Sequence, residues 1–301
     1  VFGLTFSLTA SCFGIWILIG PAEASTWGGV GAVIGYAAGQ SFVFLYFSKI
    51  GEKIRKILPN AKSLTEVIEK RYDQKVLKLI LVLTILYLYV YFCAEVTAIS
   101  KVVNLILGTP LWLTAALTII STLIYSLKGG LKISIITDKL QFWIIIIFLL
   151  MIFIILNQKI DFLSPSLITS KSSNLSIGFG GFTAGLTFFI AVFATNLFDQ
   201  GIWQRVYASK NIEVLKKGFT AAFCIVLITI LLLGLVGIYA SLNGNIKDPS
   251  IIIFSLLVNK EYLLLNLVIL ILSLTLVLSS LDTLIASVSS LFVIHSNKFI
   301  K

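Results

Sequence analysis

Residues 262–294 read YLLLNLVILILSLTLVLSSLDTLIASVSSLFVI, a run in which Asp282 is the one charged side chain. An apolar run of this length is typical of a helix that crosses a bilayer about 30 Å thick. Its second half is unusual, because residues 277–290 place serines, a threonine and an aspartate where hydrocarbon is expected. An unsatisfied polar group inside a membrane is costly, so such groups face other helices, water or a ligand. We therefore expect this polar face to point away from lipid.

Apolar runs of similar length recur along the whole chain. Of the 301 residues, 58% are hydrophobic and 12% are charged, and the mean hydropathy is +1.04. A soluble domain of this size carries more charge on its surface. The sequence predicts an all-α polytopic membrane protein with a single transmembrane domain over residues 1–301. The expected spans are 4–20, 27–48, 79–107, 111–126, 136–157, 179–199, 219–242 and 262–294.

The basic residues are distributed unevenly between the expected loops. With residue 1 placed in the cytoplasm, 18 of the 23 lysines and arginines fall in segments 49–78, 127–139, 200–218 and 295–301. Four fall in outside segments, and Lys101 lies near the outer end of the third span. This asymmetry follows the positive-inside rule. The net charge of +10 therefore indicates topology and contact with the lipid bilayer, and we expect no nucleic-acid partner.

Cysteine and histidine are too few to suggest metal or catalytic chemistry. Cys12, Cys93 and Cys224 all fall inside spans, where they are expected to pack as small apolar residues. His295 is the single histidine, so no histidine metal site or histidine-dependent triad is expected, and we do not predict an enzyme. The first span begins almost at residue 1 and the last is followed directly by HSNKFIK, which favours a fragment or a truncated gene.

The first span reads FSLTASCFGIWILIGP over residues 6–21 and mixes small and hydroxyl residues with apolar ones. Small residues allow membrane helices to pack closely. A break in the helix near Ala10–Gly14 is the alternative, because carbonyl groups freed by such a break can coordinate a cation. The residues alone favour neither close helix packing nor a helix break.

Two polar stretches lie at the ends of spans. In YSLKGGLKISIITDKLQ, residues 125–141, the simpler interpretation is that Thr137 or Asp138 caps the start of a helix. In TNLFDQGIWQRVYASKN, residues 195–211, the acid Asp199 and the base Arg205 suggest an interfacial ion pair or a cytoplasmic gate. Glu95, the deepest acid of the third span, is a functional candidate by default, and its role stays open.

The hydroxyl residues of the last span form a stripe. Ser279, Ser280, Thr283 and Ser287 recur at helical spacing, and Asp282 lies one turn from Ser279. Hydroxyl oxygens suit a hard cation such as sodium. Hydrogen bonds between helices are the alternative use of such groups, at about 0.6–2 kcal/mol each. That alternative explains scattered serines better than an adjacent pair followed by an acid.

The chain resembles the sodium/solute symporter family, which includes proline, pantothenate, sugar and urea symporters. The likeness covers essentially all 301 residues, and the spacing of residues 195–210 is most similar to the urea-type and uncharacterised branches. Its markers are ASCFGIWILIGP (10–21), SLTEVIEKRYD (63–73), YSLKGGLKISIITDKLQ (125–141), WQRVYASKN (203–211) and SSLDT (279–283).

The resemblance implies a leucine-transporter-type fold of five plus five inverted-repeat helices. Residues 1–157 would form the first repeat with five helices, and residues 158–301 a partial second repeat with three. It also implies a bound sodium ion, co-transported with the solute. Asp138 and Asp282 are expected on the cation path, so Asp138 would be more than a cap. The implied sodium ligands are the carbonyl groups of Ala10, Phe13 and Leu276 and the hydroxyls of Ser279 and Ser280.

The implied function is sodium-coupled symport of a small polar organic solute across the plasma or inner membrane by alternating access. Candidate solutes are urea, an amino acid, a polyamine or a carboxylate. Cys12 replaces an acid of proline-type members, and Ile17, Val192 and Thr195 replace sugar-site residues, so sugar is not expected. A non-transporting sensor or channel-like homologue and an inactive truncated relic are the alternatives. The expected solute cavity or gate comprises Ser11, Trp16, Glu95, Thr195, Asp199 and Gln204.

Overall fold

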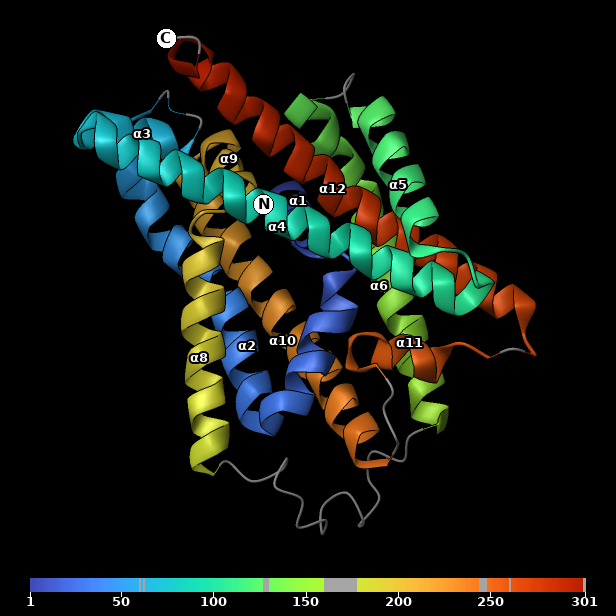
Figure 1. The fold of residues 1–301 in the computed structure, drawn as a ribbon. Helices are drawn as coiled ribbons and strands as arrows, with labels where there is room; N and C mark the ends of the chain where they lie inside the picture. Colours follow the sequence, from blue (N-terminus) through green and yellow to red (C-terminus); the bar gives the residue numbers. More distant parts are fainter. Residues whose placement is uncertain are drawn as a thin grey trace.

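The computed structural model describes residues 1–59, 61, 63–126, 130–159, 178–243, 248–259 and 261–299. Within these ranges the secondary structure is helical throughout, without strands (Figure 1). The elements are α1 (Phe2–Cys12), α2 (Trp16–Ile57), α3 (Leu64–Arg71), α4 (Gln74–Leu107), α5 (Leu111–Ser126), α6 (Gly130–Lys159), α8 (Phe179–Asn196), α9 (Gln200–Ala208), α10 (Ile212–Asn243), the short η1 (Pro249–Ile251), α11 (Ile252–Leu257) and α12 (Leu263–Phe299).

Six of the described helices are long and apolar enough to cross a membrane, namely α2, α4, α6, α8, α10 and α12. Helices α1 and α5 are shorter and also apolar. The expected spans 79–107, 111–126, 136–157, 179–199, 219–242 and 262–294 each coincide with one helix, although α8 ends at Asn196 rather than Asp199. The prediction of an all-helical, multi-pass membrane protein is confirmed.

The expected first span, 4–20, is broken in its middle. Helix α1 ends at Cys12 and α2 begins at Trp16, because Phe13 has φ −91° and ψ 72°, outside the helical region. The break overlaps the stretch near Ala10–Gly14 where the sequence offered one as an alternative, so an uninterrupted helix is excluded for this span. Helix α2 then reverses direction at Gly28–Gly29, where Gly29 adopts φ 55°, a left-handed value that favours glycine (Figure 1).

The starts and ends of several helices follow from local chemistry. Ser63, Asp73 and Asp199 cap α3, α4 and α9 by accepting a hydrogen bond from a backbone N–H of the first turn. Helix α4 ends at Leu107, and the next residue, Gly108, adopts the left-handed conformation with φ 70°. These residues therefore fix where the shorter helices α3 and α9 begin and where the long α4 begins and ends.

Helix α2 packs closely against both α8 and α10. Gly31 and Gly35 of α2 lie against the backbone of α8 at Gly181 and Gly185, so closely that an added Cβ atom would meet those carbonyl groups. Small residues at such crossings let membrane helices approach and gain van der Waals contact. Gly31 and Gly35 therefore serve helix packing.

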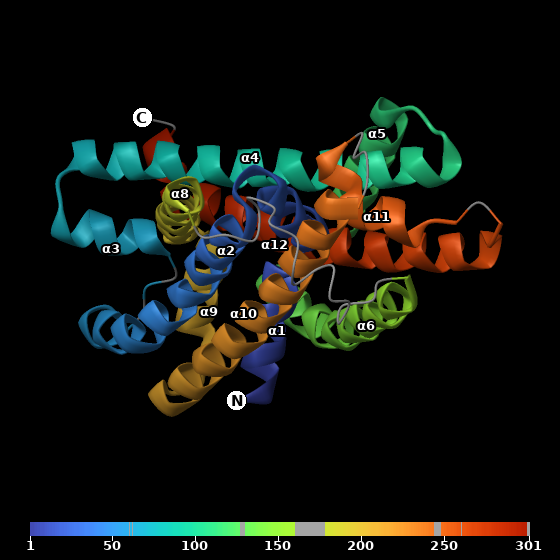
Figure 2. The ribbon, with the colours of Figure 1, turned by 90° about the horizontal axis from the view of Figure 1, so that it is seen from below.

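Helix α12 crosses the molecule next to α4, and the two views in Figures 1 and 2 agree on this arrangement. It also contacts α1, α5, α6 and α9. The hydroxyl stripe faces these helices, because Ser279, Ser280, Thr283 and Ser287 are all buried. The polar half of the last span therefore lies inside the helix bundle, as expected.

Candidate functional site

The break between α1 and α2 lies directly against the paired serines of α12. The Ser279 Oγ donates a hydrogen bond to the carbonyl oxygen of Ala10 at 3.2 Å, across 269 residues of sequence. The Ser280 Oγ lies 3.5 Å from the carbonyl oxygen of Leu276, one turn earlier on α12. Phe13, fully buried, occupies the break itself. The five residues expected to hold sodium therefore come from the two elements that meet here.

Glu95 of α4 reaches into the same break. Its carboxylate accepts hydrogen bonds from the backbone N–H of Ile15 at 3.0 Å and of Trp16 at 3.4 Å. It also accepts the Ser280 hydroxyl at 2.9 Å. An added Cβ at Gly14 would overlap this carboxylate, so glycine provides the space. Glu95 therefore caps the first turn of α2, where backbone donors would otherwise be unsatisfied.

Asp138 lies in a second buried polar cluster, and the cap interpretation of this residue is wrong. Helix α6 begins at Gly130, two turns before Asp138, so the carboxylate cannot cap its start. Instead, Asp138 Oδ2 lies 2.7 Å from Arg205 Nη2, with both side chains buried. The Ser7 hydroxyl donates to the same carboxylate oxygen at 2.7 Å.

Arg205 therefore does not pair with Asp199 at the membrane surface, and the interfacial ion pair expected between them is wrong. Its Nη1 donates to the Gly201 carbonyl at 3.0 Å and its Nη2 to Thr283 Oγ1 at 3.3 Å. The Asp199 carboxylate caps α9 and accepts the Tyr87 hydroxyl at 3.4 Å. The Arg205 side chain of α9 is therefore buried against Asp138, and Asp199, at the start of α9, lies beside a cavity.

The two clusters meet at the serine pair. The Ser279 Oγ lies 3.4 Å from Asp138 Oδ1, and Ser280 donates to Glu95. Asp282, also buried, lies on the same helix. The groups that meet Ser279 and Ser280 in these contacts all present oxygen atoms, which suit a hard cation.

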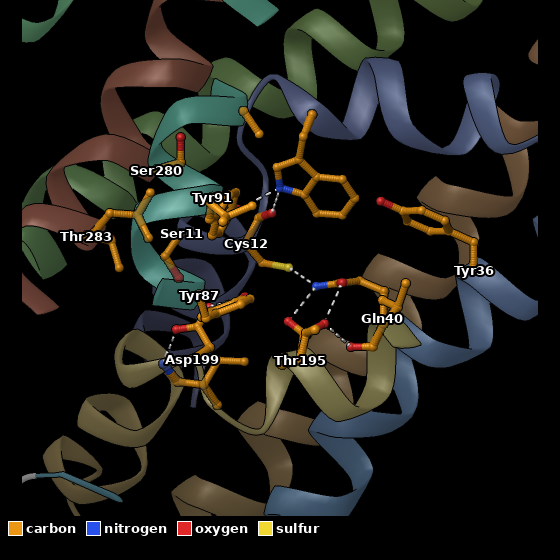
Figure 3. Close-up of a pocket in the computed structure, with 17 residues that line it drawn as sticks. Ser11, Cys12, Tyr36, Gln40, Tyr87, Tyr91, Thr195, Asp199, Ser280 and Thr283 are labelled. Atoms are coloured by element: carbon orange, nitrogen blue, oxygen red, sulfur yellow. Dashed lines mark hydrogen bonds between the residues drawn. The ribbon is translucent and has the colours of Figure 1, made fainter. Parts of the chain in front are cut away.

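A cavity of about 290 Å³ adjoins the break (Figure 3). Five of the residues that the sequence assigned to sodium or solute line it, namely Ser11, Trp16, Thr195, Asp199 and Ser280, and Thr283 does so too. Glu95 is fully buried behind Ser280. Gln204 is not among the lining residues, because its amide turns to Ser290 Oγ at 2.8 Å.

The sequence interpretation missed a pair of amides in the wall of this cavity. The Gln40 Nε2 donates to Cys12 Sγ at 3.0 Å and to Asn196 Oδ1 at 3.2 Å, and Asn196 Nδ2 donates back to Gln40 Oε1 at 2.8 Å (Figure 3). Both amides are buried. Gln40 lies well inside the expected span 27–48, and an amide at such a position was the signal that could have identified it.

Aromatic side chains form much of the remaining wall, and three tyrosines among them were also missed. Trp16 Nε1 donates to the Tyr91 hydroxyl at 2.6 Å and to the Cys12 carbonyl at 3.0 Å. Tyr36 and Tyr87 are the other two aromatic residues that line the cavity, as Figure 3 shows. Tyrosines in long apolar spans are common at membrane interfaces, so no local pattern indicated that these three line a cavity.

The fold is that of a solved symporter structure. The solved structure of a Na⁺-coupled sialic acid symporter, in a substrate-bound outward-open state, matches this chain with a TM-score of 0.79 at 17% identity. The match covers 97% of this chain and 65% of the symporter chain. The leucine-transporter-type fold implied by the family resemblance is confirmed. The division into repeats at residues 157 and 158 stays a prediction.

The family model described as Sodium:solute symporter family matches residues 1–301, so the chain belongs to this family. The spermidine transporter DUR31 of Candida albicans (strain SC5314 / ATCC MYA-2876) is 23% identical over 243 residues. That alignment covers 81% of this chain and 46% of the transporter. The chain thus spans about half the length of the curated relative it matches.

Proposed function

We propose that this protein carries a small polar organic solute into the cell together with sodium, across the plasma or inner membrane, by alternating access. The observation that carries the proposal is the 3.2 Å contact between Ser279 Oγ and the Ala10 carbonyl at the broken first span. A broken helix facing hydroxyl groups is an arrangement that secondary transporters use for Na⁺. The proposed ligands are the carbonyls of Ala10, Phe13 and Leu276 and the hydroxyls of Ser279 and Ser280.

The ion would join parts of the protein that move relative to one another. Sodium bound between α1 and α12 would favour the conformation in which these helices lie close together. A ligand shifts such an equilibrium only through its different affinity for the two states. Solute bound in the adjacent cavity would shift the same conformational equilibrium through its own difference in affinity for the two states, before the site opens inward. Each sodium ion moving with the membrane potential would contribute about 2.3 kcal/mol per 100 mV.

Sodium dependence of Ser279→Ala tests the ion site. In proteoliposomes, the sodium concentration for half-maximal solute uptake should rise about tenfold, equivalent to about 1.4 kcal/mol of binding free energy. Ser273→Ala is the matched control, because Ser273 is a buried serine on the same helix whose hydroxyl bonds to its own helix, at the Ile269 carbonyl. Equal sodium dependence in both variants and the parent protein would refute the assignment.

The same vesicles separate transport from the alternatives. A coupled symporter accumulates labelled solute above its outside concentration only when an inward sodium gradient is present. A channel-like homologue would equilibrate the solute without accumulating it, with or without that gradient. A sensor or an inactive relic would give no flux above that of empty vesicles.

The cavity lining favours an amine among the four candidate solutes. Among the described residues that line it, Asp199 is the single charged one. Four aromatic rings, those of Trp16, Tyr36, Tyr87 and Tyr91, surround the same space. Aromatic faces and a carboxylate both attract an ammonium group, and neither attracts a carboxylate. We propose a protonated amine, of which polyamines are one class, and the similarity to a spermidine transporter agrees with this.

Asp199→Asn tests the charge of the solute and preserves the cap of α9, because asparagine caps helices as well as aspartate. Removing a charge-assisted contact of about 1.5–3 kcal/mol should weaken spermidine binding roughly 10- to 100-fold. Asp73→Asn is the control, since Asp73 also caps a helix, α4, but lies outside the cavity. Binding of urea or acetate in place of spermidine, unaffected by Asp199→Asn, would overturn the amine proposal and leave sodium coupling untouched.

A further inference from the structure

The neighbouring serines of α12 have different carboxylates as hydrogen-bond partners. Ser279 Oγ lies 3.4 Å from Asp138 Oδ1, on α6. Ser280 Oγ donates to Glu95 Oε2 at 2.9 Å, on α4. A hydroxyl that gives its proton to a carboxylate still has both oxygen lone pairs for a cation. Ser280 can therefore bond to the Glu95 carboxylate and to an ion at the same time.

The two carboxylates differ in their own charge partners. Asp138 is paired with the Arg205 guanidinium at 2.7 Å, so its negative charge is balanced within the protein. Within the described part of the chain, Glu95 accepts hydrogen bonds from three neutral donors, the N–H groups of Ile15 and Trp16 and the Ser280 hydroxyl. It is completely buried. A buried carboxylate without a cation is unfavourable, and a bound monovalent cation nearby would offset that cost.

The structure holds the Glu95 carboxylate in place from three sides. The Ile15 N–H and the Ser280 hydroxyl both bond to Oε2, the Trp16 N–H bonds to Oε1, and Gly14 leaves the space for the carboxylate. Backbone N–H groups at a helix start carry partial positive charge and orient a carboxylate. The position of Glu95 is thus set by the same break that presents the Ala10 and Phe13 carbonyl groups.

We infer that Glu95 is the positioning residue that provides the counter-charge for sodium at the proposed site and orients Ser280 toward the ion. This inference rests on the proposed function, because it requires a cation between α1 and α12. It also links the ion to the solute. Glu95 bonds to the backbone of Trp16, and the Trp16 ring lines the cavity. Sodium binding would thereby stabilise one wall of the solute cavity.

Sodium-dependent thermal stability of the purified protein tests the inference without any transport assay. Sodium chloride would be titrated against choline chloride at constant ionic strength, and the melting temperature recorded. Glu95→Gln keeps the size of the side chain and removes its charge. The sodium concentration at half-maximal stabilisation should rise about 10- to 100-fold, the usual effect of losing a residue that supports a metal ligand. Glu213→Gln, which removes an exposed carboxylate on α10, should leave it unchanged.

Gly14→Ala provides a second variant that leaves Glu95 itself intact. Gly14 does not have a positive φ, so alanine is allowed by the backbone. Its methyl group would overlap the carboxylate and displace it from Ser280. The sodium midpoint should again rise. Gly180→Ala is the control, because no described atom lies within 4 Å of the added methyl group. If Glu95→Gln fails to fold, the comparison of Gly14→Ala with Gly180→Ala still tests whether the position of the Glu95 carboxylate affects sodium binding.

The outcomes separate the inference from the function on which it rests. A parent protein that sodium stabilises, with an unchanged midpoint in Glu95→Gln and Gly14→Ala, overturns the role of Glu95 and leaves the ion site standing. The role of Glu95 is equally overturned if either variant lowers the melting temperature without moving the midpoint, since Glu95 would then be only a helix cap. A parent protein that does not respond to sodium at all contradicts the proposed function itself.

Discussion

Arg205 and Asp138 form an ion pair with 2.7 Å between Nη2 and Oδ2, although 67 residues separate them and neither side chain reaches solvent. The pair joins α9 to α6. Ser7 of α1 bridges it, because its hydroxyl donates to Asp138 and accepts from Arg205 Nε at 2.9 Å. Three helices therefore meet at one charged contact next to the serine pair of α12.

Breaking this pair should destabilise the protein strongly. Asp138→Asn leaves the arginine charge buried without its counter-charge, and we expect a loss of about 3–5 kcal/mol in the free energy of unfolding. Denaturation in detergent micelles measures it. Lys217→Met, at the exposed pair with Glu213, should have no measurable effect. Comparable losses in both variants would contradict the buried, desolvated character of the Arg205 pair.

The contact between α2 and α8 should not tolerate an added methyl group. A Cβ at residue 35 would meet the backbone carbonyl of Gly185, so Gly35→Ala must push the helices apart. Overpacking of this kind costs about 1–3 kcal/mol. The melting temperature of Gly35→Ala should fall, while that of Gly180→Ala, on α8 with no described atom near the added methyl group, should stay unchanged. A stable Gly35→Ala variant would mean that the helices do not pack at this glycine.

The Gln40–Asn196 pair should behave as a coupled unit. Gln40→Leu removes the partner of a buried amide, and an unsatisfied buried polar group costs about 1–3 kcal/mol. Replacing both residues by leucine removes the unmatched group, so the double variant should regain part of that stability. A double-mutant cycle on unfolding free energies measures the coupling. Strict additivity of the two single changes would show that the amides do not depend on each other.

Acid should weaken the contact between Lys101, near the outer end of α4, and Asp248, which lies outside the spans. Burial favours a higher pKa for Asp248, but hydrogen bonds from Ser250 and Lys101 outweigh it, and the pKa lies below its ordinary value. A lowered pKa means that the stabilisation is complete above the unfolded-state pKa and is lost as pH falls through the folded-state value.

Lys101→Met should therefore lower the melting temperature at pH 7 slightly, by an amount equivalent to less than about 1 kcal/mol, because both side chains are partly exposed. The difference from the parent protein should shrink as the pH falls below about 4, where aspartate is protonated in the unfolded chain. Melting curves from pH 3 to pH 7 would show this. If the difference in melting temperature between the parent protein and Lys101→Met grew with acidity, the pKa of Asp248 would not be lowered in the folded protein.

Local patterns were sufficient for much of the fold. Long apolar runs predicted the membrane helices, since a span needs only enough hydrophobic length and internal backbone hydrogen bonds. The glycine and hydroxyl residues of the first span indicated a break as one of two possibilities. The ends of spans were less certain, because capping side chains such as Asp199 take effect only in the folded backbone.

Partners of buried polar residues could not be derived in the same way. Asp138 had the local context of a helix cap, and Arg205 had that of an interfacial base near Asp199. Their actual contact depends on how α6 and α9 pack against α1, which no short stretch of sequence encodes. The Gln40 and Asn196 amides were missed for the same reason, since each meets its partner only across helices.

The order of residues along the chain was enough to predict a polytopic helical membrane protein with polar groups concentrated in its first and last spans. The length of an apolar run and the spacing of hydroxyl residues depend only on neighbouring positions in the sequence, so both can be recognised without a structure. The packed helices were needed to show that Glu95 meets the broken helix, that Asp138 meets Arg205, and that aromatic rings surround Asp199. Such contacts depend on distant helices coming together, because burial makes each polar group bond to whichever partner the packing brings within reach.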